Sequence, residues 1–202
     1  MIDVERAAAA IRGGLLAVVP TDTVYGLACT PYREGPVRRL SELKGRSPSQ
    51  PVALVAANVD WLLDCVPELR GRGGVVARAL LPGAYTLVLA NPARRFPWLT
   101  GERPDTIGVR VPALSGPGRA LLDEVGAVAA TSANLHGGVD PRTLEEVPDE
   151  IHAGVAAVLD AGVLPGTAST VVDVTGSEPR VLREGAVPGA DALARVHEVL
   201  AQ

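Results

Sequence analysis

The sequence predicts an α/β protein with a mixed sheet, because short apolar runs alternate along the chain with segments of helical pattern. Proline and glycine close most of the apolar runs, and the 17 prolines and 22 glycines concentrate between the predicted elements. No internal repeat, low-complexity tract or linker interrupts this alternation. We therefore expect a single domain over residues 1–202, with shaped loops on which binding sites can lie.

The first half of the chain begins with a predicted helix at 3–12, for which Asp3 is a candidate N-cap and the following glycine pair is the stop. LLAVV at 15–19 is a short apolar run closed by a proline, which is typical of a buried strand. The other elements expected in this half are a strand at 24–30, a helix at 36–44, a strand at 51–56, a broken helical region at 58–81 and a strand at 84–90.

The second half begins with TIGVRVP at 106–112, which alternates as a strand does and would place Thr106, Gly108 and Arg110 on one face. The other elements expected in this half are a helix at 118–126, strands at 127–133, 155–162, 169–175 and 181–184, and a closing helix at 190–200.

The composition indicates a globular protein, since 47% of the residues are apolar and 21% are charged. The formal net charge of −4 argues against a tight grip on nucleic acid, which normally requires a basic excess. Cys29 and Cys65 match no metal-binding spacing, and we expect buried thiols in a reducing compartment. No signal peptide is recognisable, and no apolar run approaches the roughly 20 residues of a membrane helix, so we expect a cytoplasmic protein without membrane contact.

The segment PTDTVYGL at 20–27 places polar side chains between two predicted strands. Thr21 and Thr23 offer hydroxyls and Tyr25 offers a phenol, groups that suit a small polar ligand such as an amino acid. The alternative is a turn in which Asp22 and the threonines bond to their own backbone.

Three cations lie within or beside predicted elements. Lys44 and Arg46, at the end of the predicted helix and just beyond it, could clamp successive phosphates or simply complement the helix dipole. Arg110 lies in an otherwise apolar strand and requires an anionic partner, which could be a ligand carboxylate or a structural Asp or Glu.

Two further loops combine hydroxyls, an amide and a cation. ATSAN at 130–134 ends a predicted strand, where α/β proteins usually bind ligands. Ser132 could contact a carboxylate or phosphate and Asn134 a base or ribose, although an ordinary Asn/Gly turn is the alternative. Ser169 precedes a later strand, and the downstream Arg183 is a candidate anion contact beside it.

No nucleophile–base pair accompanies these loops, because His136, His152 and His197 lie in no triad-like setting. A Walker-type glycine loop is also absent from the sequence. Hydroxyls, amides and cations without a nucleophile favour catalysis by positioning and charge stabilisation in a nucleotide reaction.

In order and spacing, these segments resemble the YrdC-like family of threonylcarbamoyl-AMP synthases, in its short single-domain type. The matching segments are PTDTVYGL, KGRS, PGAYT, TIGVRVP, TSANLHG, STVVD and VLREG, spread over roughly residues 10–188. The resemblance implies an open twisted mixed sheet flanked by helices, with a large concave pocket. It also implies a nucleotidyltransferase that forms L-threonylcarbamoyladenylate and pyrophosphate from ATP, L-threonine and bicarbonate, for the threonylcarbamoyladenosine modification of tRNA.

The resemblance implies roles for the matching residues. As catalytic groups, Lys44 and Arg46 would stabilise phosphate charge. The threonine contacts would be Thr23, Tyr25, Arg110, Ser132 and Ser169. The ATP contacts would be Lys44, Arg46, Gln50, Thr106, Asn134, Arg142 and Arg183. Mg²⁺ would enter with ATP without a metal ligand from the protein side chains, and the adenylate would pass to downstream tRNA threonylcarbamoyl-transferase machinery.

Several positions depart from the family pattern. Val55 lies where many members carry a histidine that contacts threonine, and the other departures are Ser47, Gln50, His136, Arg142 and Glu184. The departures at Val55, His136 and Glu184 motivate one alternative, a YrdC-like paralogue that carbamoylates or adenylates another acceptor. A second alternative is a non-enzymatic RNA-binding or ribosome-associated protein. The acidic balance and the 3% aromatic content argue against it but leave room for a weak RNA contact.

Overall fold

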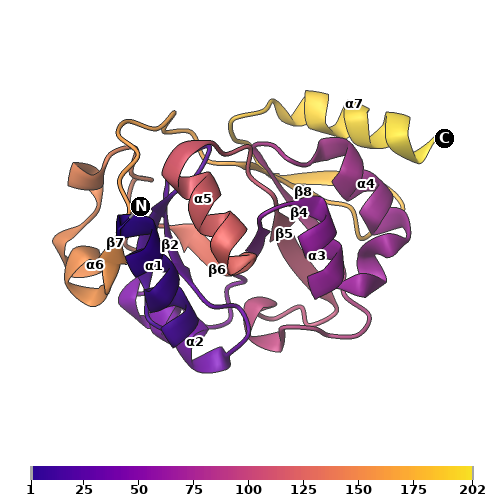
Figure 1. The fold of residues 1–202 in the computed structure, drawn as a ribbon. Coiled ribbons are helices and arrows are strands. Elements are labelled where there is room, and N and C mark those ends of the chain that lie inside the picture. Colours follow the sequence, from indigo (N-terminus) through magenta and orange to yellow (C-terminus); the bar gives the residue numbers. More distant parts are fainter. Residues whose placement is uncertain (1, 202) are drawn as a thin grey trace.

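The computed structural model describes residues 2–201 and contains a nine-stranded mixed sheet with helices packed against it (Figure 1). The strand order is β7-β1-β2-β6-β3-β5-β4-β8-β9, so the sheet is open, with β7 and β9 at its two edges. The strands are β1 (Ala17–Pro20), β2 (Tyr25–Cys29), β3 (Ala53–Ala56), β4 (Tyr85–Ala90), β5 (Thr106–Arg110), β6 (Ala127–Ser132), β7 (Ala157–Val158), β8 (Thr170–Asp173) and β9 (Arg180–Arg183). Strands β1 and β7, β3 and β5, and β4 and β8 pair in parallel, and the other neighbours pair antiparallel. The predicted α/β class with a mixed sheet is confirmed.

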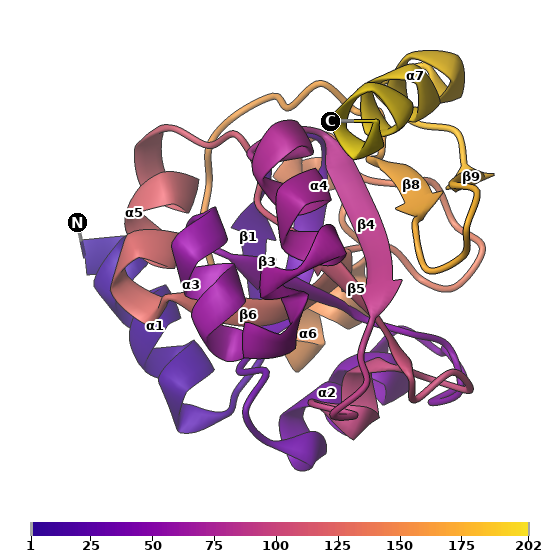
Figure 2. The same cartoon turned by 90° about the vertical axis from the view of Figure 1, so that its right-hand side faces the viewer.

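The helices are α1 (Ile2–Gly13), α2 (Glu34–Leu43), α3 (Val59–Cys65), α4 (Arg72–Leu80), α5 (Gly116–Val125), α6 (Asp149–Gly154) and α7 (Gly189–Leu200). Short 3₁₀ turns, η1 (Pro67–Arg70), η2 (Pro97–Leu99) and η3 (Leu144–Glu146), lie between them. Helix α6 lies near one edge of the sheet and α7 near the other (Figure 1). Figure 2 shows β8, β9 and α7 together beside the long strand β4. Within residues 2–201, no helix combines the length and the apolar character that a bilayer crossing requires.

One face of the sheet carries the larger of two hydrophobic cores. Alternate strand residues point to it, among them Leu27, Leu54, Leu87 and Val109, all 0% exposed. Buried apolar residues of α2, α3, α4 and α7 close this core. Because burying one such side chain contributes about 1.5–3 kcal/mol, this continuous layer is the main source of stability.

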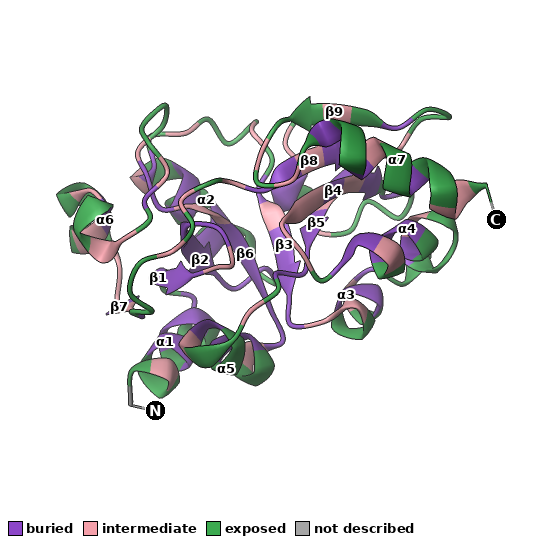
Figure 3. Ribbon diagram, turned by 90° about the horizontal axis from the view of Figure 1, so that it is seen from above, coloured by how far each residue is buried: buried purple, intermediate pink, exposed green. Residues whose placement is uncertain are grey.

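The opposite face is covered by helices over only part of its width. Helices α1 and α5 contact each other and bury the small alternate residues of β1, β2 and β6 in a second core (Figure 1). Ala8, Ile11 and Leu121 supply the helix side of this core, and Ala28 and Val128 supply the sheet side. Figure 3 shows the central strands buried and the outer sides of α1, α5 and α7 exposed.

Helix ends follow local chemistry. The side-chain oxygen of Asn58 caps α3 by accepting a hydrogen bond of 2.8 Å from the Trp61 backbone N–H. Helix α5 stops at Gly126, whose φ of 77° is readily adopted only by glycine. Helix α1 begins at Ile2, so the predicted cap Asp3 instead lies in the first turn, where its carboxylate complements the helix dipole.

Two segments differ from the expectation. The strand predicted at 155–162 is reduced to the two residues of β7, because the chain then turns and Asp160 accepts a hydrogen bond from the Tyr25 hydroxyl. Helix α6 was not predicted. It has six residues, too few to show a helical pattern, and the buried Ile151 ties it to the larger core.

Candidate active site

A cavity of about 440 Å³ lies on the second face of the sheet, beside the part that α1 and α5 cover. This volume falls within the range of small-molecule sites. The alternate residues of three strands form its floor: Thr106, Gly108 and Arg110 of β5, Thr86 and Val88 of β4, and Val171 of β8. The predicted common face of Thr106, Gly108 and Arg110 is thereby confirmed.

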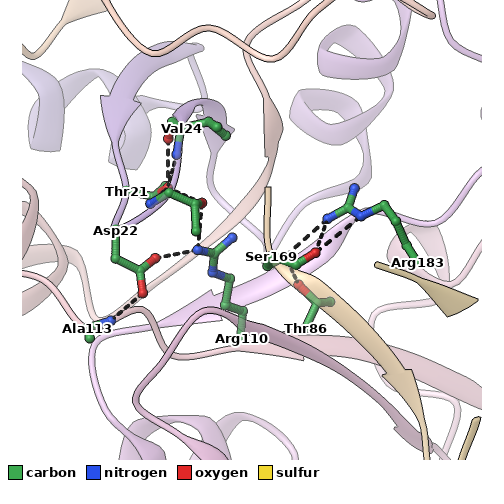
Figure 4. Close-up of polar contacts among 9 residues, drawn as sticks. Thr21, Asp22, Val24, Thr86, Arg110, Ala113, Ser169 and Arg183 are labelled. Carbon is green, nitrogen blue, oxygen red and sulfur yellow. Dashed lines mark hydrogen bonds and ion pairs between the residues drawn. The ribbon is translucent and has the colours of Figure 1, made fainter. Parts of the chain in front are cut away.

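Arg110 ends β5 with its side chain buried at the cavity wall (Figure 4). Its Nη2 donates to a carboxylate oxygen of Asp22 and, at 2.9 Å, to Thr23 Oγ1. The other oxygen of Asp22 accepts a bond of 2.8 Å from the Ala113 N–H. Burial lowers the pKa of Arg110, and Asp22 acts in the opposite direction. The anionic partner left open by the sequence is therefore a structural aspartate, and Arg110 still faces the cavity.

The guanidinium group of Arg110 is not fully hydrogen-bonded within the protein. Among the described residues, its buried Nε–H has no hydrogen-bond partner. A buried donor without a partner is costly. Thr21, next to this group, is held within its own turn: its hydroxyl donates to Val24 O at 2.7 Å, as the turn alternative predicted (Figure 4).

A second arginine lies across the floor. Arg183 of β9 donates to Ser169 O at 2.8 Å and to Ser169 Oγ at 3.1 Å (Figure 4). The Ser169 hydroxyl also meets the Thr86 hydroxyl at 2.8 Å. Glu184, one of the departures from the family pattern, does not neutralise Arg183. The Glu184 carboxylate instead accepts a hydrogen bond of 2.9 Å from the Gly189 N–H, at the start of α7.

The third arginine of the cavity is Arg46. It donates to Gln50 Oε1 at 2.7 Å, to Pro51 O at 2.7 Å and to Thr131 Oγ1 at 3.2 Å, all neutral oxygens. Burial lowers its pKa, and the nearby charge of Arg183 lowers it further. Gln50 is thus placed to orient Arg46, and does not belong to the described cavity lining.

Lys44 lies behind the cavity wall. Only 5% exposed, it reaches from the end of α2 to the loop after β6. Its Nζ donates to Ser132 O and Asn134 O, both at 2.7 Å, and to the Asn134 side-chain oxygen. Burial lowers its pKa to about 8, with a smaller contribution in the same direction from Arg46. Lys44 therefore holds the loop at 131–134 (the TSAN loop) in place. Its burial excludes the alternative that it is an exposed cation that only complements the dipole at the end of the helix.

The TSAN loop contributes Ser132 to the cavity lining. The Ser132 hydroxyl donates to Asn134 Oδ1 at 2.6 Å, and the Asn134 amide donates to Gly138 O. The Asn134 side chain is thus engaged within its loop, and its predicted contact with ATP stays a prediction.

Two further predicted contacts, Tyr25 and Arg142, also lie outside the cavity lining. The Tyr25 hydroxyl donates to Asp160 Oδ1 at 2.9 Å and to Gly162 O at 2.8 Å, and burial raises its pKa to about 12. Arg142 holds the neighbouring loop through its backbone, accepting from Leu164 N at 2.8 Å. Neither residue belongs to the described lining of the cavity.

Sequence reasoning missed several residues that line the cavity. Thr86 ends the PGAYT segment, but only the pairing of β4 with β8 places it in the site, whereas the ATSAN segment already pointed to Thr131. Arg103 lies in a loop whose sequence offers no motif, yet it lines the cavity. Cys29 and Cys65 are free thiols outside this lining; Cys29 is buried as expected, whereas Cys65 is partly exposed.

An open mixed sheet whose uncovered face holds a cavity lined by four arginines defines an α/β protein with a cavity of small-molecule size. More narrowly, the chain belongs to the Sua5/YciO/YrdC family, whose model, described as telomere recombination, matches residues 9–185. The resemblance noted in the sequence is confirmed.

Relatives and solved structures agree with this assignment. The chain is 36% identical over 195 residues to a Mycobacterium tuberculosis protein provisionally named threonylcarbamoyl-AMP synthase, covering 96% of this chain and 87% of that protein. It is 33% identical to the threonylcarbamoyl-AMP synthase of Pyrococcus abyssi, covering 90% of this chain but 54% of the relative. Sua5 of P. abyssi, in complex with L-threonine, superposes with a TM-score of 0.85 at 32% identity, over 98% of this chain and 57% of Sua5. YciO of Escherichia coli superposes with a TM-score of 0.81 at 26% identity, over 94% and 92% of the two chains.

Proposed function

We propose that this protein is an L-threonylcarbamoyladenylate synthase, a nucleotidyltransferase that converts ATP, L-threonine and bicarbonate into threonylcarbamoyl-AMP and pyrophosphate. The names of its relatives and the threonine bound by P. abyssi Sua5 support the substrates. The proposed place of action is the cytoplasm, with the product passed to tRNA threonylcarbamoyl-transferase machinery.

One observation carries the proposal: Arg183 lies in the same cavity as Arg46 and Arg110, close enough for its charge to act on both. The charge of Arg183 lowers the pKa of both Arg46 and Arg110. Within residues 2–201, neither Arg46 nor Arg183 forms an ion pair with a carboxylate. Two arginines that line a cavity without a paired carboxylate are stabilised by an anionic ligand, and the triphosphate of ATP supplies that charge.

The proposed chemistry divides these groups between the two substrates. Arg110, oriented by Asp22 and Thr23, would hold the threonine carboxylate, with Ser132 and Ser169 nearby to accept or donate hydrogen bonds. The threonine amine takes up carbon dioxide from bicarbonate, and a carbamate oxygen then attacks the α-phosphorus of ATP as the bond to pyrophosphate breaks. Arg46 and Arg183 would neutralise the charge that develops on the phosphate oxygens. Lys44 would act indirectly, because it holds Ser132 in place from behind the cavity wall.

Magnesium would be bound mainly through ATP. The described residues contain no group of three side chains suited to holding a metal ion. Glu102 and Asp140 each line the cavity, and Mg²⁺ commonly takes one or two carboxylates together with substrate phosphates. When bound, the ion would supply further neutralisation of phosphate charge.

The test is pyrophosphate release from ATP and Mg²⁺, with bicarbonate and each of several amino acids added in turn. We expect release only when both bicarbonate and threonine are present. Arg183→Ala should raise the KM for ATP about tenfold, and Arg110→Ala should mainly raise the KM for threonine. Each variant is informative only if its circular dichroism spectrum matches that of the parent, which shows that it folds.

Other outcomes would identify the alternatives. Release that depends on a different acceptor would favour a paralogue, for which Val55 in the cavity wall is the residue to examine. No release with any acceptor, together with RNA binding that weakens steeply with salt, would favour a non-enzymatic RNA-binding role.

A further inference from the structure

The cavity floor extends along β5 between two chemically different ends. Thr106 and Arg110 are four residues apart on one strand, which corresponds to roughly 13 Å. The Arg110 end has Asp22 and lies near the charge of Arg183. The Thr106 end holds a fourth arginine, Arg103, to which neither the family resemblance nor the proposed reaction gives a role.

Arg103 and Thr106 belong to one turn at this end. The backbone oxygen of Arg103 accepts hydrogen bonds from both the Thr106 N–H and the Thr106 hydroxyl, each 3.0 Å. The Arg103 side chain then extends to β8, where Nη1 donates to Asp173 Oδ2 at 3.3 Å and Nη2 to Thr175 Oγ1 at 3.4 Å. About half of the side chain stays exposed, so the guanidinium is held at one edge while much of it stays accessible.

Asp173 is built to hold this arginine. It follows Val171 by two residues on β8, so its side chain points to the cavity face, yet it is 1% exposed. Burial acts to raise its pKa, but the bonds from Thr175, Arg103 and Arg180 outweigh it and lower the pKa. The carboxylate is therefore ionised at neutral pH and shared between Arg103 and Arg180.

Apart from Glu102 and Thr106, the lining near Arg103 includes small or branched apolar residues of the sheet, namely Gly108, Val88 and Ala53. A planar heteroaromatic ring fits such a surface, whereas a phosphate chain is attracted to the arginines elsewhere in the cavity. A guanidinium held by its edge can stack on such a ring or contact its polar atoms.

We propose that Arg103 binds the nucleoside end of ATP and that Asp173 is the residue that positions it. The inference rests on the proposed function, because it takes ATP as the nucleotide. In this inference, Arg103 contacts the ligand, and Asp173, the last residue of the STVVD segment, positions the Arg103 side chain at the cavity rim.

The chain offers a matched control for the test. Arg180 shares the Asp173 carboxylate at 3.2 Å, but it is exposed and lies outside the described cavity lining. We would compare Arg103→Gln, Arg180→Gln and Asp173→Asn with the parent by calorimetric titration of ATP, AMP, tripolyphosphate and threonine. Arg103→Gln should weaken ATP and AMP by the same factor, about tenfold, and should leave tripolyphosphate and threonine within about twofold. Arg180→Gln should bind all four like the parent.

Asp173→Asn should reproduce the selective loss of ATP and AMP binding. A general loss of structure would instead weaken the binding of all four ligands. If this variant does not fold, Arg103→Gln decides alone. Unchanged AMP binding by Arg103→Gln would overturn the proposal, as would an equal loss of tripolyphosphate binding or the same defect in Arg180→Gln. A parent protein that binds neither ATP nor AMP would instead overturn the proposed function, and the inference with it.

Discussion

At the scale of single residues, the cavity arginines differ in what neutralises them. Arg110 is paired with Asp22, which is largely buried, and Arg103 with Asp173, which is fully buried. Arg46 and Arg183 instead donate to amide, carbonyl and hydroxyl oxygens, which orient a guanidinium without cancelling its charge. The unpaired arginines are therefore suited to the phosphates of ATP, whereas the paired arginines are held in fixed orientations by their carboxylates.

Lys44 permits a prediction about pH. Its pKa of about 8 in the folded protein lies below the roughly 10.4 of an unfolded lysine. Between these values the unfolded chain binds more protons, so the contribution of Lys44 to the free energy of unfolding rises with pH. From pH 7 to pH 9.5 the parent should gain roughly 2 kcal/mol relative to Lys44→Met, measured by urea unfolding of both proteins.

The comparison with Lys44→Met cancels the other titrations, because the two proteins share them. A free-energy difference that does not change between the two pH values would contradict the prediction. It would show that the oxygens of Ser132 and Asn134 keep the ammonium at its ordinary pKa despite burial.

At the scale of elements, α3 provides a test of how local sequence fixes a boundary. The Asn58 side chain accepts the Trp61 N–H and has no other hydrogen bond among those the structure describes. Asn58→Ala should lower the free energy of unfolding by about 1 kcal/mol, because a first-turn N–H loses its partner. Asn58→Asp retains the acceptor and should change stability by only a few tenths of a kcal/mol. Equal losses in both variants, measured by urea unfolding, would show that the capping bond is not the cause.

The elements also show what the sequence can predict. Alternation in TIGVRVP identified β5 and the face that carries Arg110, because a half-buried strand has a period of two residues. The helical region at 58–81 breaks at Pro67 and Gly71 into α3, η1 and α4, but Gly73 and Gly74, which were also expected to break it, lie within α4. Helix α6 escaped prediction because its existence depends on one buried residue, Ile151, and not on a repeated pattern.

The site was less predictable than the fold. Hydroxyls and cations in the motif segments indicated which loops matter, but not which atoms face a ligand. Tyr25 and Asn134 belong to motif segments, yet their polar atoms bond within the protein. Arg103 and Thr86 face the cavity because distant strands pair, and only the folded sheet brings them there.

At the scale of the whole molecule, the cavity joins two halves of one sheet. Arg46 and Ser132 line it from the side of α2 and β6, and Ser169 and Arg183 line it from the side of β8 and β9. Beneath it, the larger core runs without interruption from Val18 in β1 to Val196 in α7. Such a layout leads us to expect that both halves unfold together, in keeping with the predicted single domain.

Ligand binding should therefore stabilise the entire chain. At an ATP concentration of 100 times Kd, the free energy of unfolding should rise by about 2.7 kcal/mol. For a protein of 202 residues this corresponds to an increase in Tm of about 5–10 °C, measured by calorimetry in the presence of Mg²⁺. Arg183→Ala at the same ATP concentration should show a smaller increase, because it binds less ATP. A single unfolding transition whose Tm rises with ATP would support one cooperative unit, in which the substrate bridges two parts of one core. Two transitions, of which ATP moves only one, would show that the halves of the sheet unfold separately and that the cavity lies between two units.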